Sequence, residues 1–90
     1  MMRVEAGVAL LAGDLTLGNA SDWLAEGEAA LKQGVVIFDL SGVGQLDSSA
    51  LSLLLSLRRR AQAAGSRIEF RQLPESLVSL AKLYGVADQI

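Results

Sequence analysis

The clearest pattern in the chain is an unbroken apolar run, VVIFDL, at residues 35–40. Because the run is short, rich in β-branched and aromatic side chains and followed by polar residues, it predicts a central strand buried on both faces. Two shorter apolar segments precede it at residues 3–6 and 8–12, separated by Gly7 and followed by a turn signal at residues 13–14. This arrangement predicts a β-hairpin at the start of the chain.

A helical pattern follows the hairpin and ends at Gly34. Asn19 and Ser21 are both suitable N-cap residues, so the helix is expected to start after one or the other. Gly27 lies inside this segment and costs about 1 kcal/mol relative to alanine in a helix. Its presence counts against this helix.

Two further helices and a strand complete the predicted set. Residues 48–64 form a leucine- and serine-rich helical segment that ends at Gly65. Residues 67–72 alternate between apolar and polar side chains, which indicates a half-buried strand. A last helix begins at Pro74, a favoured first helical position, and ends at Gly85.

The predicted order of elements is therefore β-β-α-β-α-β-α. A strand, helix and strand in succession, here residues 35–72, place the two strands parallel through a right-handed crossover. Ninety residues suffice for one small domain and not for two, so we expect a single α/β domain over residues 1–90. Its architecture would be a small mixed β-sheet packed with about three helices. Binding residues in such sheets follow the carboxyl ends of parallel strands, which points to a loop at 41–46 and to residues 47–49.

The helix at 48–64 carries more apolar residues than one buried face needs. At about 100° per residue, one stripe is expected to face the sheet. Its members are Ala50, Leu53, Leu54, Leu57, Ala61 and Ala64. Leu51 and Leu55 lie beyond the edge of this stripe, one turn apart. Either a neighbouring helix covers them, or they form a partner-binding strip continuous with Ser48.

The same analysis of the last helix places Leu77, Leu80, Ala81 and Tyr84 on its inward stripe. Leu83 falls on the outer side. A single exposed leucine is common on protein surfaces and needs no special role.

Asp47 and Ser48 stand where the predicted loop enters the second helix. Either side chain can accept hydrogen bonds from the unpaired amides of the first helical turn, so capping alone explains both residues. The same position also displays a hydroxyl in a positive local potential. It is therefore suited to a hydrogen bond with a partner protein or to carrying a phosphate.

Composition narrows the chemistry further. The chain has no histidine and no cysteine, so it cannot form a Ser-His-Asp or Cys-His nucleophile pair, a disulfide or an imidazole-based zinc site. It also lacks a glycine-rich P-loop, and we expect no enzymatic activity, no cofactor and no metal. A net charge of -2 is the wrong sign for a nucleic-acid partner.

The longest apolar stretch, at residues 51–57, is far shorter than the about 20 residues of a membrane helix. The N-terminus lacks the basic start and sustained apolar centre of a signal peptide. We therefore expect a cytoplasmic protein without direct membrane insertion.

One segment resembles a known family. The strand with Asp-Leu-Ser, a short loop and then Asp-Ser-Ser opening a leucine-rich helix, VVIFDLSGVGQLDSSALSLLLSL, resembles the STAS domain. Anti-sigma factor antagonists and the tails of anion transporters share this domain, and its element order matches nearly the whole chain. Together with SLAKLYGV at residues 79–86, the segment is similar to the STAS subunits of Mla-type phospholipid ABC transporters.

This resemblance implies a non-enzymatic accessory subunit that binds and stabilises or regulates an MlaF-like ATPase. The ATPase would belong, with its permease, to an ABC transporter that maintains the lipid asymmetry of the outer membrane. The subunit would thus lie in the cytoplasm, peripheral to the inner membrane of a bacterium through its partner.

By motif position, Ser48 takes the place of the hydroxyl residue, a threonine or serine, that follows the aspartate in this family. Asp47 and Ser49 would flank it at the contact. The family often has glycine where this chain has Ala50, and that methyl group restricts close approach of a partner backbone. We expect the contact to extend over a few more residues of the loop and helix. These are Gly44, Gln45, Leu51 and Leu55.

A second function stays open for the same motif. In an anti-sigma factor antagonist, Ser48 would be a phosphoacceptor, and its phosphate would repel the partner by charge.

Overall fold

Buried and half-buried residues alternate along the two central strands, and this alternation shows which face of the sheet carries the core. In β2 (Val8–Leu15), Ala9 and Leu11 are buried, and in β3 (Ile37–Leu46), Phe38 and Leu40 are buried. The residues between them are only half-buried. Since successive side chains of a strand point to opposite faces, the core lies on one side of the sheet. The predicted burial of the 35–40 strand on both faces is therefore wrong.

The computed structural model describes all of residues 1–90, and its sheet has four strands in the order β1-β2-β3-β4. The edge strands are β1 (Met2–Glu5) and β4 (Glu69–Arg71). β1 pairs with β2 antiparallel, whereas β2 with β3 and β3 with β4 are parallel. The predicted hairpin, the parallel crossover and the mixed α/β sheet are confirmed.

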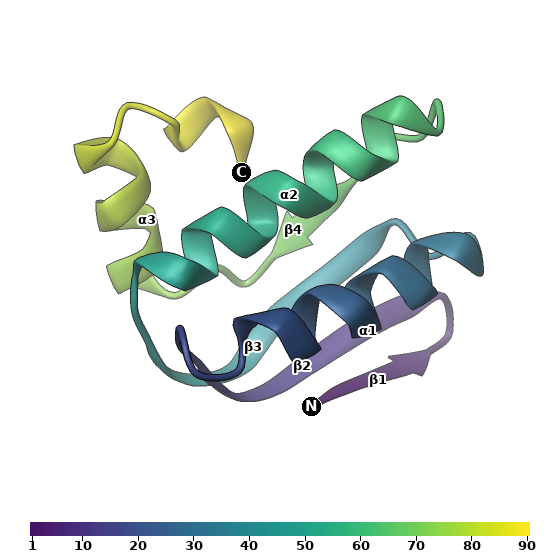
Figure 1. Ribbon diagram of the computed structural model, residues 1–90, viewed down its shortest axis with the longest axis horizontal. Helices are drawn as coiled ribbons and strands as arrows, with labels where there is room; N and C mark the ends of the chain where they lie inside the picture. The colour runs from purple at the N-terminus through teal and green to yellow at the C-terminus, as the bar shows by residue number, and fades with distance from the viewer.

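Two helices, α1 (Ala20–Lys32) and α2 (Ser48–Ala63), lie side by side on one face of this sheet (Figure 1). A third, α3 (Glu75–Leu83), packs against α2 near its start and leads into a short 3-10 turn, η1 (Ala87–Gln89). The opposite face of the sheet carries no helix (Figure 1). The predicted order β-β-α-β-α-β-α is confirmed, and η1 follows it.

As predicted, a glycine follows the end of each helix: Gly34 after α1, Gly65 after α2 and Gly85 after α3. Each glycine has a left-handed backbone, with φ of 86°, 76° and 73°. After α1, for example, the amide of Val35 donates to the carbonyl of Ala30 at 3.0 Å, which satisfies a carbonyl left free by the last turn. This is the Schellman arrangement, and glycine adopts it without the steric cost that a Cβ would add.

The predicted turn at residues 13–14 and the predicted loop at 41–46 are wrong, because both segments are strand. β2 continues to Leu15 and β3 to Leu46, where the two residues are partners in the parallel ladder. The ladder contains two register shifts in this part. Such irregularities bend a strand without ending it.

Gly42 explains why a turn-like sequence can remain a strand here. A Cβ on Gly42 would lie 2.7 Å from the carbonyl oxygen of Leu11 and 3.2 Å from the Cα of Ala12. Glycine inside a strand often marks a close approach of two backbones, and that is its function at this position.

Smaller differences occur at the end of the chain. β4 is shorter than the predicted strand at 67–72, since Gln72 has a left-handed φ of 55° and leaves the ladder. Pro74 is the N-cap of α3 and not its first residue. Its extended ψ of 143° directs the chain into the helix that begins at Glu75.

Gly27 also has a packing role. A Cβ at this position would lie 2.6 Å from Cδ2 and 3.1 Å from Cδ1 of Leu57, which is fully buried in α2. Its absence lets α1 and α2 approach closely. The intrinsic cost of glycine in a helix is thus offset by packing between helices.

Replacing Gly27 with alanine is expected to lower the free energy of unfolding by about 1–3 kcal/mol, the usual cost of overpacking a core. Urea denaturation followed by circular dichroism measures this change. In a Leu57→Ala background, which provides space, the same substitution should no longer destabilise the fold. A stabilising effect of Gly27→Ala in the wild-type background would contradict the close helix contact.

Candidate functional site

The predicted site lies where β2 and β3 end and the first turns of α1 and α2 begin. Asp47 is the N-cap of α2, and its Oδ1 accepts a hydrogen bond from the amide of Ser49 at 2.8 Å. Its Oδ2 accepts a second bond, from the amide of Leu17 at 3.1 Å. One carboxylate therefore links the turn before α1 to the start of α2.

These bonds also set the charge of Asp47. The amide of Leu17, and after it that of Ser49, stabilises the carboxylate and lowers the pKa of Asp47 below its ordinary value. Asp47 is consequently ionised at neutral pH. Ser48, exposed at the surface, stands directly beside this negative charge.

Gly44 and Gln45, predicted as loop residues of the site, lie at the end of β3. The amide of Gln45 donates to Oδ1 of Asp14 at 2.8 Å. A Cβ on Gly44 would lie 2.7 Å from the same oxygen. Asp14 thus holds the backbone of this segment in place, and both residues are exposed beside the start of α2.

Asp14 is a residue whose structural importance the sequence did not reveal. Its carbonyl oxygen accepts hydrogen bonds from Nε1 of Trp23 at 3.0 Å and from Nδ2 of Asn19 at 2.8 Å. Asn19 is the N-cap of α1 by position, but its side chain bonds the chain before the helix and not the helix amides. Asp14 therefore fixes the start of α1 as Asp47 fixes that of α2.

A groove of about 320 Å³ opens beside Ser48, between α2 and the segment that ends α3. We call it the α2–α3 groove, and it is lined by Ser48, Leu51, Ser52, Leu55, Tyr84 and Val86. The groove therefore brings Ser48 together with Leu51 and Leu55, the two leucines that helical periodicity placed outside the core stripe.

The structure corrects the expectation of an exposed leucine strip. Leu51 is only 4% exposed and belongs to the core, so the alternative of coverage by a neighbouring helix holds for it. Leu55 is half-buried and packs against that core. Only Leu55 therefore offers part of its side chain to a partner in the groove.

Tyr84, expected on the inward stripe of the last helix, is 58% exposed. The helix ends at Leu83, and Tyr84 is already its C-cap, so the helical angle no longer sets the direction of its side chain. Leu83 faces solvent as expected and is 76% exposed. Two large side chains thus stand at the surface next to the α2–α3 groove.

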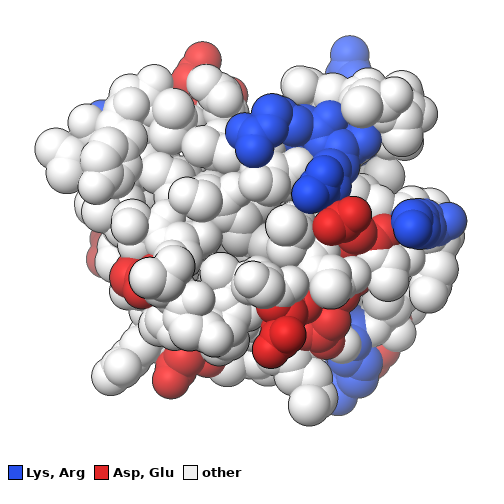
Figure 2. Space-filling view, viewed as in Figure 1, with Lys and Arg blue, Asp and Glu red and all other residues white.

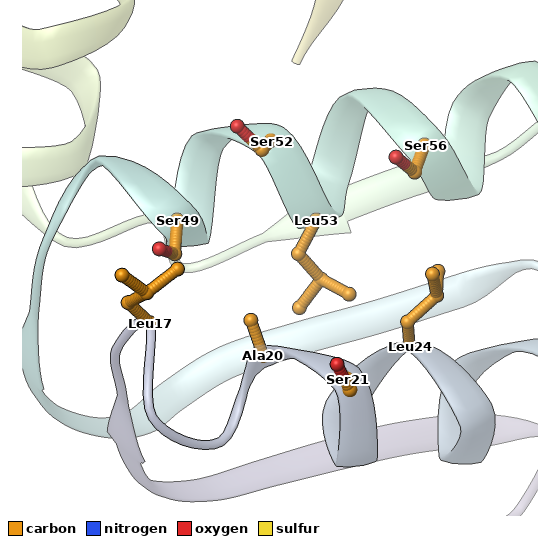
Figure 3. A pocket seen from close by; sticks show the side chains of 8 residues that line it. All are labelled: Leu17, Ala20, Ser21, Leu24, Ser49, Ser52, Leu53 and Ser56. Atoms are coloured by element: carbon orange, nitrogen blue, oxygen red, sulfur yellow. The ribbon is translucent and has the colours of Figure 1, made fainter.

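A second groove of about 240 Å³ lies on the other side of the start of α2 (Figure 3). We call it the α1–α2 groove, and it is lined by Leu17, Ala20, Ser21, Leu24, Ser49, Ser52, Leu53 and Ser56. Leu17 is 79% exposed and lies close to Ser49 in this view. The sequence offered one signal for Leu17, an apolar residue between Thr16 and Gly18 in a segment with no predicted element.

Charges are unevenly distributed over this side of the molecule. Figure 2 shows Lys and Arg gathered over the later turns of α2 and Asp and Glu over α1, whereas the surface over α3 and the start of α2 is mostly uncharged. No three His, Cys, Asp or Glu side chains lie together in a way that could hold a metal ion. The arrangement can therefore bind through apolar contact and through the hydroxyl of Ser48.

The acid sensitivity of the fold is expected to depend on Asp47. A carboxylate with a lowered pKa in the folded state stabilises the fold above its ordinary pKa of 3.8 and loses that contribution as the pH falls through the folded value. Asp47→Asn keeps an acceptor for the Ser49 amide and removes the charge. Its free energy of unfolding should therefore fall less steeply than that of the wild type on acidification below about pH 4.

Urea denaturation at a series of pH values measures these slopes. Asp22→Asn, which removes an exposed carboxylate of α1, serves as the matched control. Equal flattening in both variants would contradict a specific role for Asp47.

Comparisons with known structures agree with the overall fold. The anti-sigma factor antagonist SpoIIAA in its unphosphorylated form is 20% identical, with a TM-score of 0.68 over 92% of this chain and 81% of that chain. The Bacillus cell fate determinant SpoIIAA in the phosphorylated form is also 20% identical, with a TM-score of 0.71 over 99% and 86% of the two chains. At this identity the likeness shows the fold.

No curated protein matches the sequence. A family model described as "Mlab, STAS domain" matches residues 2–90, nearly the whole chain. This match includes every strand and helix described above, since β1 begins at Met2. The chain therefore belongs to the STAS domain family.

Proposed function

We propose that this chain is a non-enzymatic accessory subunit that binds the ATPase subunit of an ABC-type phospholipid transporter and stabilises or regulates it. STAS domains are typically regulatory binding modules rather than enzymes. The family model that matches the chain carries the Mlab description, which supports the transporter branch of the family. The contact with the ATPase would be made by the α2–α3 groove and the start of α2.

The observation that carries this proposal is the meeting of two sequence motifs. Asp-Ser-Ser-Ala-Leu begins at Asp47, and Ser-Leu-Ala-Lys-Leu-Tyr-Gly begins at Ser79. They are far apart in the sequence, yet Ser48 of the first and Tyr84 of the second line the same groove. Both motifs underlie the similarity to transporter STAS subunits, and their proximity supports one shared binding surface.

The chemistry of the groove fits a protein partner. The hydroxyl of Ser48 can donate and accept a hydrogen bond at one end, while Leu55, Tyr84 and Val86 provide apolar contact. Cores of protein interfaces are depleted of charge, as this surface is (Figure 2), and enriched in aromatic residues, of which this groove has Tyr84. We expect an apolar face of the ATPase with a polar group placed to meet Ser48.

The proposal also places the protein in the cell. Bound to the ATPase and, through it, to the permease, the subunit would lie on the cytoplasmic side of the bacterial inner membrane. None of its helices has the length and apolar character needed to cross a bilayer. Attachment to the membrane would therefore depend on the partner.

Co-purification with ATPase subunits of phospholipid ABC transporters from the same genome tests this function. Ser48→Asp adds a negative charge beside Asp47, and Leu55→Arg places a charge in the apolar part of the groove. Each is expected to weaken binding at least about tenfold, the equivalent of about 1.4 kcal/mol. Titration calorimetry or a pull-down series measures the loss.

Two variants serve as matched controls. Ser66→Asp adds the same charge at an exposed serine after α2, and Gln62→Arg adds a cation at an exposed position two turns beyond Leu55. Both should bind as the wild type does. Full binding by folded Ser48→Asp and Leu55→Arg would rule out this surface, and failure of the wild type to bind any such ATPase would rule out the function.

The exposure of Ser48 favours one second candidate, an anti-sigma factor antagonist. A phosphate there would add about 1.5 to 2 negative charges next to ionised Asp47. It would repel an acidic partner by charge and oppose an apolar partner through the cost of desolvating the phosphate. This function predicts that anti-sigma kinases from the same genome transfer phosphate from ATP to wild-type protein and to Ser49→Ala, but not to Ser48→Ala. Mass spectrometry that finds no phosphate on Ser48 would contradict it.

A further inference from the structure

The side of the sheet that carries no helix shows an ordered pattern of charge. Strand register aligns two rows of residues across all four strands. The first row consists of Glu5, Val8, Ile37 and Glu69. The second row consists of Arg3, Leu10, Asp39 and Arg71. We call these two rows the open face.

The edge strands confirm which way these side chains point. Met2 and Val4 line a small groove against α1, so the alternate residues of β1 project from the other side. In β4, Phe70 packs against the core, where its ring centroid lies 6.3 Å from that of Phe38. Its two neighbours in the strand therefore also project from the open face.

The centre of the open face is incompletely covered, and three of its four residues are apolar. Val8, Leu10 and Ile37 are half-buried, and no helix packs over them (Figure 1). All-parallel sheets occur almost only with both faces covered, and this mixed sheet approaches that case because two of its three strand pairings are parallel. In the monomer, one face of the sheet therefore has no covering layer.

The rim of the open face has opposite charge in its two rows. Glutamates end the first row on both edge strands, and arginines end the second. Within the monomer, Arg3 pairs with Glu5 and Arg71 with Glu69. The same alternation at both edges allows the face to be complementary to itself.

The symmetry of a homodimer decides whether these charges match. A two-fold axis along the strands would place the glutamates of one copy over those of the other. An axis across the strands, between the two rows, places Glu5 over Arg3 of the second copy and Glu69 over Arg71 of the second copy. The same axis places Val8 over Leu10 of the second copy and Ile37 over Asp39 of the second copy, so the charged rims match and one of the two central pairs is apolar.

Asp39 is the one charged residue in the interior of this face. Its Oδ1 accepts a hydrogen bond from the amide of Ser41 at 2.8 Å, and Arg71 is its partner in the ladder. The side-chain and backbone hydrogen bonds with Ser41, together with the charge of Arg71, lower the pKa of Asp39. The carboxylate thus has partners of its own when a second copy removes it from water.

We propose that the chain forms a homodimer through the open face, with the two-fold axis across the strands. The interface is small, because two rows of four side chains cover less than the roughly 800 Å² per partner of a standard stable complex. Its affinity is accordingly weak. The α2–α3 groove lies on the helical side of the sheet, so the dimer leaves it free, and this inference does not depend on the proposed function.

Sedimentation velocity over a series of protein concentrations tests the dimer. The wild type should shift from monomer to dimer as its concentration rises. Leu10→Lys, which places a charge in the apolar centre of both copies, should weaken association at least about tenfold. Leu83→Lys, an equivalent change on the helical side, should leave association unchanged.

A charge swap tests the orientation. Arg3→Glu places acidic residues over acidic residues and should weaken the dimer severalfold, whereas Arg3→Glu combined with Glu5→Arg restores opposite charges across the axis and should recover it. Circular dichroism confirms that each variant is folded.

The remaining outcomes overturn the proposal. A wild type that stays monomeric at every concentration, or a dimer that Leu10→Lys leaves intact, excludes this interface. A double swap that does not recover association excludes the proposed axis. Loss of ATPase binding in Leu10→Lys would show that the open face contacts that partner and not a second copy, whereas failure of the ATPase proposal alone leaves the dimer unaffected.

Discussion

The close approach of the β2 and β3 backbones near Gly42 is the constraint on which the rest of the structure depends. Gly42 permits this approach because a Cβ there would meet the carbonyl oxygen of Leu11. Asp14 then fixes the end of β3 through the amide of Gln45 and the start of α1 through Trp23 and Asn19. The two helices begin side by side because the two strands end side by side. The surface around Ser48 is a product of that geometry.

Much of this fold could be predicted from the sequence because its signals are local. The apolar run at 35–40 and the glycines that follow each helix act over a few residues. The run predicted a central strand, which is confirmed from Ile37 onward, and the glycines predicted the helix ends. The extension of β3 through 41–46 could not be predicted in the same way. Gly42 allows close contact with a strand that is distant in the sequence, whereas its local sequence predicts a turn.

The candidate site shows the same division. The exposure of Ser48 and the capping by Asp47 follow from helix termini, which are local features. The burial of Leu51 depends on where the end of the chain packs, and the exposure of Tyr84 depends on where α3 stops. The sequence assigned Asp14 to a turn, whereas the structure places it at the junction of three elements.

The shared carboxylate of Asp47 has a consequence for how the protein responds to a bound molecule. The amide of Leu17 donates to it from the turn before α1, and the amide of Ser49 donates to it from the first turn of α2. A ligand that immobilises either of these two segments shields the carboxylate of Asp47. We therefore expect the protection of these two amide protons from exchange with deuterated water to rise and fall together. A molecule bound in one groove would then change the exchange rate of an amide at the edge of the other groove.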